Sequence, residues 1–236
     1  MFIMIDGIDG SGKSTVIQSW KDCLAKEGNA IFDLKNYWLE KRGEFPDLSE
    51  LKSYDFVFSC EPTYSPIGKT IREELIKNGE KYPPRAIAEA YSLDRLILYN
   101  KIIIPLLKTG KCVIQDRGIS SSLAYQNLQG LSLKEISRLP GNELALKYRP
   151  DYLVFMDLKP EEAIKRLGSR AEKKDDSIFE KEKFLKKLAK QFKSREFQNI
   201  FLKKGTRIHR LKTDVKIDIM KRDATNLLTA ILNRNG

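Results

Sequence analysis

A short run near the start of the chain combines glycines, hydroxyl side chains and one lysine in a spacing that suits phosphate chemistry. It reads Gly7-Ile8-Asp9-Gly10-Ser11-Gly12-Lys13-Ser14-Thr15. The glycines let backbone N–H groups curl around phosphate oxygens, and the N-terminus of a following helix adds positive potential. Lys13 would reach the β- and γ-phosphates of ATP, and the Ser14 hydroxyl would ligate Mg²⁺. We therefore predict ATP and Mg²⁺ as cofactors, with ATP bound by Gly7, Gly10, Ser11, Gly12, Lys13, Ser14 and Thr15.

A carboxylate at the end of a later apolar run is a candidate for the same metal. Residues 111–116 are expected to form a strand that ends in Asp116. In a protein with a phosphate loop, such an aspartate holds Mg²⁺, usually through water. A strand-end aspartate can instead cap the following turn, but the phosphate loop upstream favours the metal. Ser14 and Asp116 are therefore the predicted metal ligands.

Strands that alternate with helices must position these residues. Apolar runs predict strands over 2–6, 55–60, 111–116 and 152–158, and a final short strand is expected over 207–211. Helical patterns are expected over 13–26, 67–77, 84–107, 120–129, from 160 onward, 179–201 and 219–232. The alternation implies an α/β fold with three layers, in which helices cover both faces of a parallel sheet. Residues 30–34 are either an additional strand or half of an interrupted one, and residues 36–54 are expected to be a surface insertion.

Chain length and net charge limit the possible binding partners but do not identify one. The chain has 236 residues and a formal net charge of +11, which suits a single domain over 1–236 with polyanionic partners. Much of the excess charge lies in residues 181–204, where a solvated helix face is favoured over a nucleic-acid surface. We find no apolar run of membrane-spanning length and no signal peptide, and Cys23, Cys60 and Cys112 have no metal spacing. We therefore expect a cytoplasmic protein that binds neither membrane nor nucleic acid.

Four further motifs follow the phosphate loop in a fixed order. They are Glu61-Pro62-Thr63 leading to Ile67-Gly68-Lys69-Thr70-Ile71-Arg72, then Tyr91-Ser92-Leu93-Asp94-Arg95, then Asp116-Arg117-Gly118-Ile119-Ser120-Ser121-Ser122-Leu123-Ala124-Tyr125-Gln126, and last Pro150-Asp151-Tyr152-Leu153-Val154-Phe155-Met156-Asp157-Leu158. With Asp9 inside the loop, they resemble the thymidylate kinase family over residues 1–192, with one insertion. The resemblance implies a P-loop kinase fold with a small lid, and ATP-dependent phosphorylation of dTMP to dTDP.

The resemblance also implies an acceptor site within about residues 61–126. Asp9 would accept a hydrogen bond from the 3′-hydroxyl of dTMP, and Arg72 and Arg117 would clamp its phosphate. Glu61 would orient a nearby arginine or a substrate water. The alternative for Arg72 is an exposed pair with Glu73 or Glu74, which would carry little energetic weight.

The same resemblance places five residues around the base and sugar. Tyr91 would stack on thymine, with Arg95 one helical turn later to hydrogen-bond the base edge. Ser122 and Gln126 would contact the thymine edge, and Tyr125 would lie under the sugar and exclude a 2′-hydroxyl. The alternatives are that Tyr91 and Tyr125 are core aromatics, and that Arg95 pairs with Asp94 or Glu89.

The chain departs from the family pattern at several positions. Many members have an aromatic residue or histidine at Gly118 and an arginine at Cys60. Ser177-Ile178-Phe179-Glu180 lacks the arginine that the family's lid usually shows at this run, and residues 36–54 are an unusual insertion.

Gly10 lies where some members carry an arginine in the phosphate loop, and relatives with this glycine supply the arginine from the lid. In a lid over about 169–182, Arg170 is the first candidate for that cation and Arg166 the second, with Lys173 and Lys174 as substitutes. Closure of the lid would also exclude water. The predicted catalytic residues are Lys13, Asp9, Arg117 and Arg170.

Two other functions and one assembly state are considered. The phosphate loop would also serve a kinase for another nucleoside monophosphate or a deoxynucleoside, or, more distantly, a P-loop ATPase that binds nucleic acid. The set of residues expected to contact a small base, around Tyr91 and Gln126, argues against the ATPase that binds nucleic acid.

Family members are usually homodimers built from helix packing. We therefore expect a homodimer formed by apolar helix faces such as Ile97, Ile102, Ile103, Leu106 and Leu107, unless these residues belong to the core.

Overall fold

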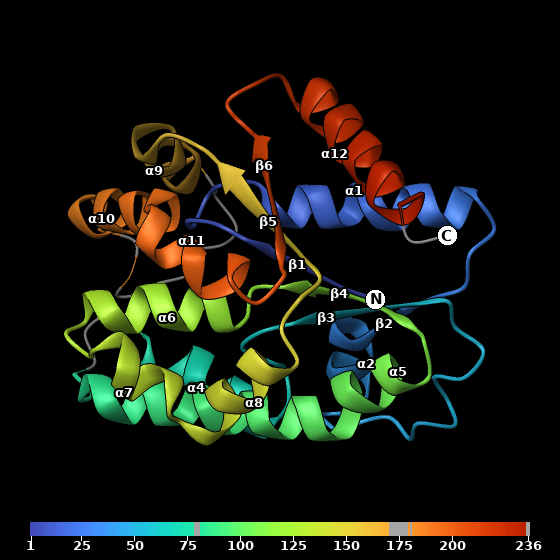
Figure 1. Ribbon diagram of the computed structural model, residues 1–236, viewed down its shortest axis with the longest axis horizontal. Helices are drawn as coiled ribbons and strands as arrows, with labels where there is room; N and C mark the ends of the chain where they lie inside the picture. The colour runs from blue at the N-terminus through green and yellow to red at the C-terminus, as the bar shows by residue number, and fades with distance from the viewer. Residues whose placement is uncertain (78–80, 170–178, 180, 235–236) are drawn as a thin grey trace.

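The computed structural model describes residues 1–77, 81–169, 179 and 181–234. Within these residues six parallel strands form one sheet in the order β2-β3-β4-β1-β5-β6 (Figure 1). The strands are β1 (Phe2–Asp6), β2 (Ile31–Asp33), β3 (Phe56–Cys60), β4 (Cys112–Asp116), β5 (Tyr152–Asp157) and β6 (Arg207–Lys212). Every residue of β1 and β3 is buried, as expected for parallel strands covered on both faces. The predicted parallel α/β sheet is therefore confirmed.

Two helices cover one face of the sheet. They are α1 (Lys13–Lys26) and α12 (Ile217–Leu232), which lie side by side in Figure 1. Trp20 on α1 is fully buried, and its indole N–H donates to the carbonyl oxygen of Ala224 on α12 at 2.7 Å. Because α1 begins directly after the phosphate loop, this packing fixes the loop against the sheet.

The larger helical layer covers the opposite face. It contains α4 (Pro84–Leu98), η2 (Tyr99–Ile103), α5 (Ile104–Lys108), α6 (Ile119–Leu128), α7 (Leu133–Ser137), α8 (Pro140–Lys147), α10 (Glu182–Lys193) and α11 (Arg195–Leu202). The predicted long helix over 84–107 is confirmed, with its middle turn, η2, in π-helical geometry. Three further helical segments follow β3 and β5 along the chain: α3 (Pro66–Thr70) and η1 (Ile71–Leu75) after β3, and α9 (Pro160–Gly168) after β5. The three-layer fold is confirmed.

The segment 36–54 is more than a surface insertion, which corrects that prediction. Its first residues belong to α2 (Leu34–Glu40), where Trp38 is buried, and Leu51 further along is buried as well. Trp38 packs edge-on against Phe45, with ring centres 5.6 Å apart. Polar residues separate these buried side chains in the sequence, so the sequence did not indicate that they belong to the core.

Three other expectations about helices need correction. The predicted helix over 179–201 is two helices, because Ser194 breaks α10 and caps α11 by accepting from the Phe197 N–H at 3.2 Å. Helices α7 and α8 were missed, although Ser132 and Glu135 form a capping box at the start of α7. Of the proposed dimer face, Ile102, Ile103 and Leu106 are buried in the chain's own core, so they cannot supply an exposed apolar surface.

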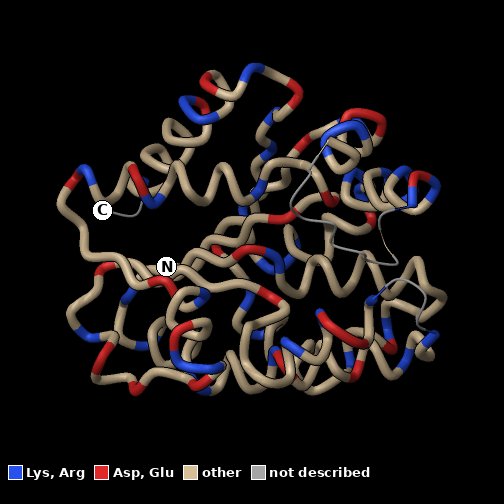
Figure 2. Tube along the Cα trace, turned by 180° about the vertical axis from the view of Figure 1, so that it is seen from behind, with Lys and Arg blue, Asp and Glu red and all other residues tan. Residues whose placement is uncertain are grey.

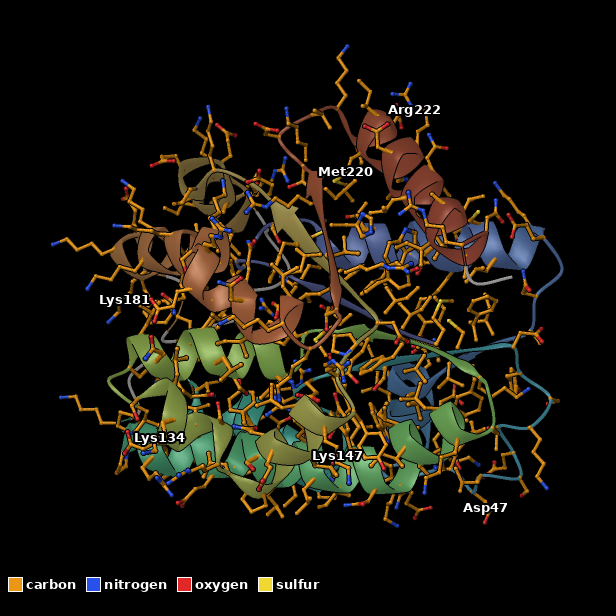
Figure 3. All side chains as sticks on the ribbon, in the orientation of Figure 1. Asp47, Lys134, Lys147, Lys181, Met220 and Arg222 are labelled. Atoms are coloured by element: carbon orange, nitrogen blue, oxygen red, sulfur yellow. The ribbon has the colours of Figure 1, made fainter. Side chains whose placement is uncertain are left out.

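Charged side chains are spread over most elements. Figure 2 shows Lys and Arg interspersed with Asp and Glu along the chain. On α10 the lysines face solvent, opposite the buried Leu185, Leu188 and Phe192, as the solvated-face interpretation expects. Lys134 and Lys181 extend away from the body in Figure 3. Among the described helices, none has the length and apolar character needed to span a membrane.

Candidate active site

The predicted functional residues that the structure describes lie at the edge of the sheet where the parallel strands end. The phosphate loop follows β1, Glu61 follows β3, and Asp116 is the last residue of β4, with Arg117 directly after it. A cavity of about 670 Å³ opens at this edge, and all nine predicted acceptor-site residues, from Asp9 to Gln126, line it together with Gly10 to Ser14 of the phosphate loop. Gly7 and Thr15 are not among the lining residues. Ligands of parallel α/β sheets bind at this carboxyl edge.

The phosphate loop keeps its shape through glycine conformations and close packing. Gly10 and Gly12 have φ angles of 78° and 91°, in the left-handed region that favours glycine. A Cβ on Gly10 would lie 2.7 Å from the carbonyl oxygen of Ala163 in α9, so a side chain at this position would clash with that helix. Therefore α9 approaches the loop closely, and an arginine at Gly10 would require α9 to move.

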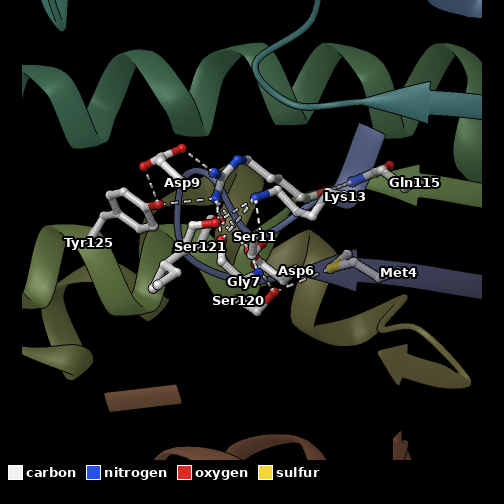
Figure 4. Close-up of polar contacts among 12 residues, drawn as sticks. Met4, Asp6, Gly7, Asp9, Ser11, Lys13, Gln115, Ser120, Ser121 and Tyr125 are labelled. Carbon is white, nitrogen blue, oxygen red and sulfur yellow. Dashed lines mark hydrogen bonds and ion pairs between the residues drawn. The ribbon is translucent and has the colours of Figure 1, made fainter. Parts of the chain in front are cut away.

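Lys13 lies over the loop with its ammonium group near backbone oxygens. Its Nζ donates to the carbonyl oxygens of Gly7 and Ile8 at 3.1 and 3.0 Å (Figure 4). Burial, with the nearby Arg117 charge, lowers the pKa of Lys13 to about 8. An anion close to Nζ would favour the charged form, as the phosphates of ATP would do.

Asp116 has the chemistry of a metal ligand. Its Oδ1 is buried and has no hydrogen-bond partner among the residues that the structure describes. A buried carboxylate oxygen without a partner is costly. Ser14 lines the same cavity and is exposed to it. A carboxylate and a hydroxyl are oxygen ligands of the type that Mg²⁺ prefers, so both residues fit the predicted ion.

Arg117 ties the phosphate loop to α6. Its guanidinium forms an ion pair with Asp9 and donates to the carbonyl oxygen of Gly7 at 3.0 Å and to the hydroxyl of Tyr125 at 3.1 Å. The Tyr125 hydroxyl in turn donates to Asp9 Oδ2 at 2.9 Å (Figure 4). Burial would raise the pKa of Asp9, but Arg117 and Lys13 outweigh it and lower that pKa. Asp9 is therefore a charged acceptor at the cavity wall, although it lies in a loop built for anions.

Asp6 is a site residue that sequence reasoning missed. This carboxylate is completely buried and accepts from the Gly7 N–H at 2.7 Å and from the Ser121 hydroxyl at 2.8 Å. It also lies 3.4 Å from the Arg117 guanidinium, while burial raises its pKa. The position of Asp6 in the sequence could have indicated this role, because a carboxylate that ends a buried strand directly before a phosphate loop needs a partner.

The far end of the cavity is built around a buried arginine. Arg95 is only 1% exposed and forms an ion pair with Glu61, which is the arginine partner expected for that glutamate. Arg95 also donates to the Ser122 hydroxyl at 2.8 Å. Burial raises the pKa of Glu61 to about 7, and the Arg95 charge opposes this shift.

The surface pairs considered for the two arginines are wrong. Asp94 accepts from the Thr63 backbone N–H and hydroxyl, and Glu89 pairs with Arg85 rather than with Arg95. Arg72 donates to the backbone oxygens of Pro62 and Thr63 rather than pairing with Glu73 or Glu74. Both arginines are therefore directed toward the cavity and its wall.

Asn142 is a second residue that the sequence did not reveal. It lies in α8, and its Oδ1 accepts from the guanidinium of Arg95. Its Nδ2 donates to the carbonyl oxygen of Ile136 at 2.8 Å, which fixes the orientation of the amide. Gly141 beside it donates its N–H to the Ser92 hydroxyl at 2.9 Å. The missed helix α8 therefore holds Arg95 in place.

Two buried polar atoms in this end of the cavity lack a partner. Arg95 Nε and Gln126 Oε1 are both buried, and the described part of the chain offers neither a hydrogen bond. One is a donor and the other an acceptor, and both side chains line the cavity. Such atoms suit the edge of a nucleobase, which carries acceptors and donors in one plane.

The lid lies largely outside the described residues. This applies to Arg170, Lys173, Lys174 and residues 177–178, so the expectation for the lid cation is neither supported nor contradicted. Phe179 is described, and its ring packs edge-on against Tyr125 with centres 5.0 Å apart. Arg166 on α9 donates to the carbonyl oxygen of Thr213 at 2.5 Å, and its Nη1 lies 3.9 Å from where a Cβ on Gly12 would stand.

A phosphate loop joined by one cavity to arginines and a pocket with nucleobase-like hydrogen-bonding groups defines a P-loop nucleotide kinase. Within that class, the family model for thymidylate kinase matches residues 47–223, so the chain belongs to the thymidylate kinase family. A probable thymidylate kinase of Thermococcus kodakarensis is 38% identical over 205 residues, 81% of this chain and 85% of the relative. The probable thymidylate kinase of Thermococcus onnurineus is 37% identical over 204 residues, with the same shares. A bacterial relative, the thymidylate kinase of Caldanaerobacter subterraneus, is 32% identical over 182 residues, 76% of this chain and 74% of the relative.

Proposed function

We propose that the protein transfers the γ-phosphoryl group of ATP to dTMP and so forms dTDP. The observation that carries the proposal is the continuous cavity between the phosphate loop and the unpartnered atoms of Arg95 and Gln126. Its volume, about 670 Å³, lies in the range of small-molecule sites. Family membership and the names of the relatives agree with this acceptor.

The chain's part in the reaction is positioning and charge stabilisation. The phosphate of a nucleoside monophosphate is already ionised near neutral pH, so the acceptor needs no general base. Lys13 would bind the transferred group, while Arg117 and Arg72 would hold the acceptor phosphate in line with it. Ser14 and Asp116 would hold Mg²⁺, which supplies neutralisation of the phosphate charge when bound. Lid closure over the site would exclude water.

The sugar and base would be recognised by the remaining cavity residues. Asp9 is charged and accessible from the cavity, so it can accept a hydrogen bond from the 3′-hydroxyl. Tyr125 is held by hydrogen bonds with Arg117 and Asp9, and its ring would exclude a 2′-hydroxyl. Arg95, Ser122 and Gln126 would meet the thymine edge, with Tyr91 stacked on its face.

A coupled assay of ADP release over a nucleotide panel tests the function. We expect dTMP to be the best acceptor, dUMP a weaker one, and ribonucleotides poor, because the Tyr125 ring would exclude a 2′-hydroxyl. The same panel with and without DNA addresses the distant alternative of a nucleic-acid-dependent ATPase. Equal turnover with UMP or CMP, or ATP hydrolysis that depends on DNA, would overturn the assignment.

Asn142→Leu is expected to weaken dTMP binding without touching the phosphate loop. The substitution removes the acceptor that orients Arg95, so the dTMP KM should rise about tenfold while kcat and the ATP KM change less than about threefold. Steady-state kinetics for both substrates measures this split. Asn100→Ala, on the exposed side of η2, is the matched control. A uniform loss in kcat with no change in dTMP KM would show that Asn142 does not act through Arg95.

We also propose that the protein is a cytoplasmic homodimer, as in many members of the family it resembles. The helix face first considered for the dimer is mostly core, so the contact must use other exposed apolar residues, such as Leu93 on α4. Light scattering at working concentration is expected to give the mass of two chains, and a monomer would contradict the proposal.

A further inference from the structure

Helix α2 places a lysine in the wall of the acceptor cavity. Lys35 lines the cavity, and the helix that carries it begins directly after β2. Asp33 at the end of that strand caps the helix by accepting from the backbone N–H groups of Lys35 and Asn36 at 2.9 and 3.4 Å. Because the described strands are all parallel, β2 ends at the same edge as the phosphate loop. The buried Leu34 therefore helps to fix Lys35 at the functional edge.

Lys35 carries a charge that the described carboxylates leave unpaired. Asp33, the nearest carboxylate in sequence, is paired with Lys21 instead. Lys35 Nζ lies 5.3 Å from the centre of the Tyr64 ring, and Arg72 Cζ lies 4.3 Å from the same ring. Two cations thus lie near one ring in the cavity wall, and an anion bound in this part of the cavity would be attracted to both.

The other arginines of the cavity already have compensating charges. Arg95 pairs with Glu61 and Arg117 pairs with Asp9. Among the described lining residues there are six Lys and Arg against four Asp and Glu, so positive charge remains in excess. Lys35 and Arg72 together match the charge of a phosphate dianion, about −2.

Cys60 lies in the wall of the same cavity. Burial raises the pKa of its thiol to about 12, so the thiol stays neutral. This position therefore supplies no cation. Lys35 reaches the same wall from the end of the neighbouring strand β2.

We propose that Lys35 binds the phosphate of the acceptor nucleotide together with Arg72. The lysine would act as a point charge beside the arginine fork, on the side of the cavity formed by α2 and Tyr64. The inference rests on the proposed function, since it requires a nucleoside monophosphate in this cavity. It gives α2 a direct part in acceptor binding and makes Lys35 a ligand of phosphate rather than of base.

Calorimetric titration with dTMP and with thymidine tests this assignment, because the two ligands differ only in the phosphate. Lys35→Met is expected to raise the dTMP Kd about tenfold and to leave the thymidine Kd within about twofold. Lys35→Arg, which keeps the charge, should retain dTMP affinity within about threefold. Lys41→Met is the matched control, because Lys41 is exposed directly after the same helix.

The outcomes separate the inference from the proposed function. An unchanged dTMP Kd in Lys35→Met, in a protein whose wild type phosphorylates dTMP, would overturn the role of Lys35 alone. An equal loss of thymidine affinity would also overturn it, since it would reveal a structural effect. Failure of the wild type to use dTMP would overturn the proposed function first. If Lys35→Met does not fold, Lys35→Gln provides the same comparison.

Discussion

Replacing Lys13 by methionine is expected to lower kcat for phosphoryl transfer about 10³-fold or more. Lys13 Nζ lies over the phosphate loop, within 3.1 Å of the Gly7 carbonyl oxygen, where the β- and γ-phosphates of ATP would replace backbone oxygens as its partners. Charge on the transferred group must be stabilised in a water-poor site, and loss of one such cation removes several kcal/mol of that stabilisation. Methionine keeps the length of the stem, so the packing of α1 against the sheet should persist.

Steady-state and single-turnover kinetics with dTMP measure this effect. Lys26→Met is the matched control, since Lys26 is exposed in the last turn of the same helix, and its activity should equal that of the wild type. The far-ultraviolet spectrum and the Tm of Lys13→Met should stay close to those of the wild type. A variant that is folded and retains kcat within tenfold would show that the phosphate loop does not serve the transferred group.

The sheet and the phosphate loop were predictable because their signals are local. The four inner strands, β1, β3, β4 and β5, are short and mostly apolar runs, since nearly all of their residues are buried. The loop combines glycines, Lys13 and Ser14 within nine residues, so neither long-range contacts nor knowledge of neighbouring strands was needed. The same locality explains why α1 was predicted with the bounds it has in the structure, Lys13–Lys26.

The contacts that sequence reasoning missed depend on residues far apart in the chain. Asn142 meets Arg95 across 47 residues of sequence, and Asp6 meets Arg117 across 111. Neither amide nor carboxylate carries a local pattern that names its partner. Lys35 was overlooked for a similar reason, because no local pattern assigns a single lysine to the site until β2 is paired with β3.

The second large effect is expected when an arginine that could stabilise the transferred phosphoryl group is removed. Arg170→Ala is expected to lower kcat about 10³-fold with the dTMP KM within a few-fold, because Gly10 leaves the phosphate loop without a guanidinium and Arg117 would be occupied with the acceptor phosphate. Arg166 has a different surrounding: its guanidinium lies between the phosphate loop at Gly12 and the carbonyl oxygen of Thr213 after β6. We therefore expect Arg166→Ala to raise the ATP KM about tenfold and to change kcat only a few-fold.

Kinetics of the two variants, with ATP and dTMP varied separately, distinguishes the two roles. Lys165→Ala is the control, because Lys165 is exposed on α9 and pairs with Glu162 on the same helix. If Arg166→Ala loses kcat while Arg170→Ala is nearly silent, the cation that stabilises the transferred group comes from α9. If neither change affects kcat but a Lys173/Lys174 double substitution does, the cation is a lysine. Unchanged kcat in all of these variants would mean that Lys13 and the metal suffice, and that the lid serves to exclude water.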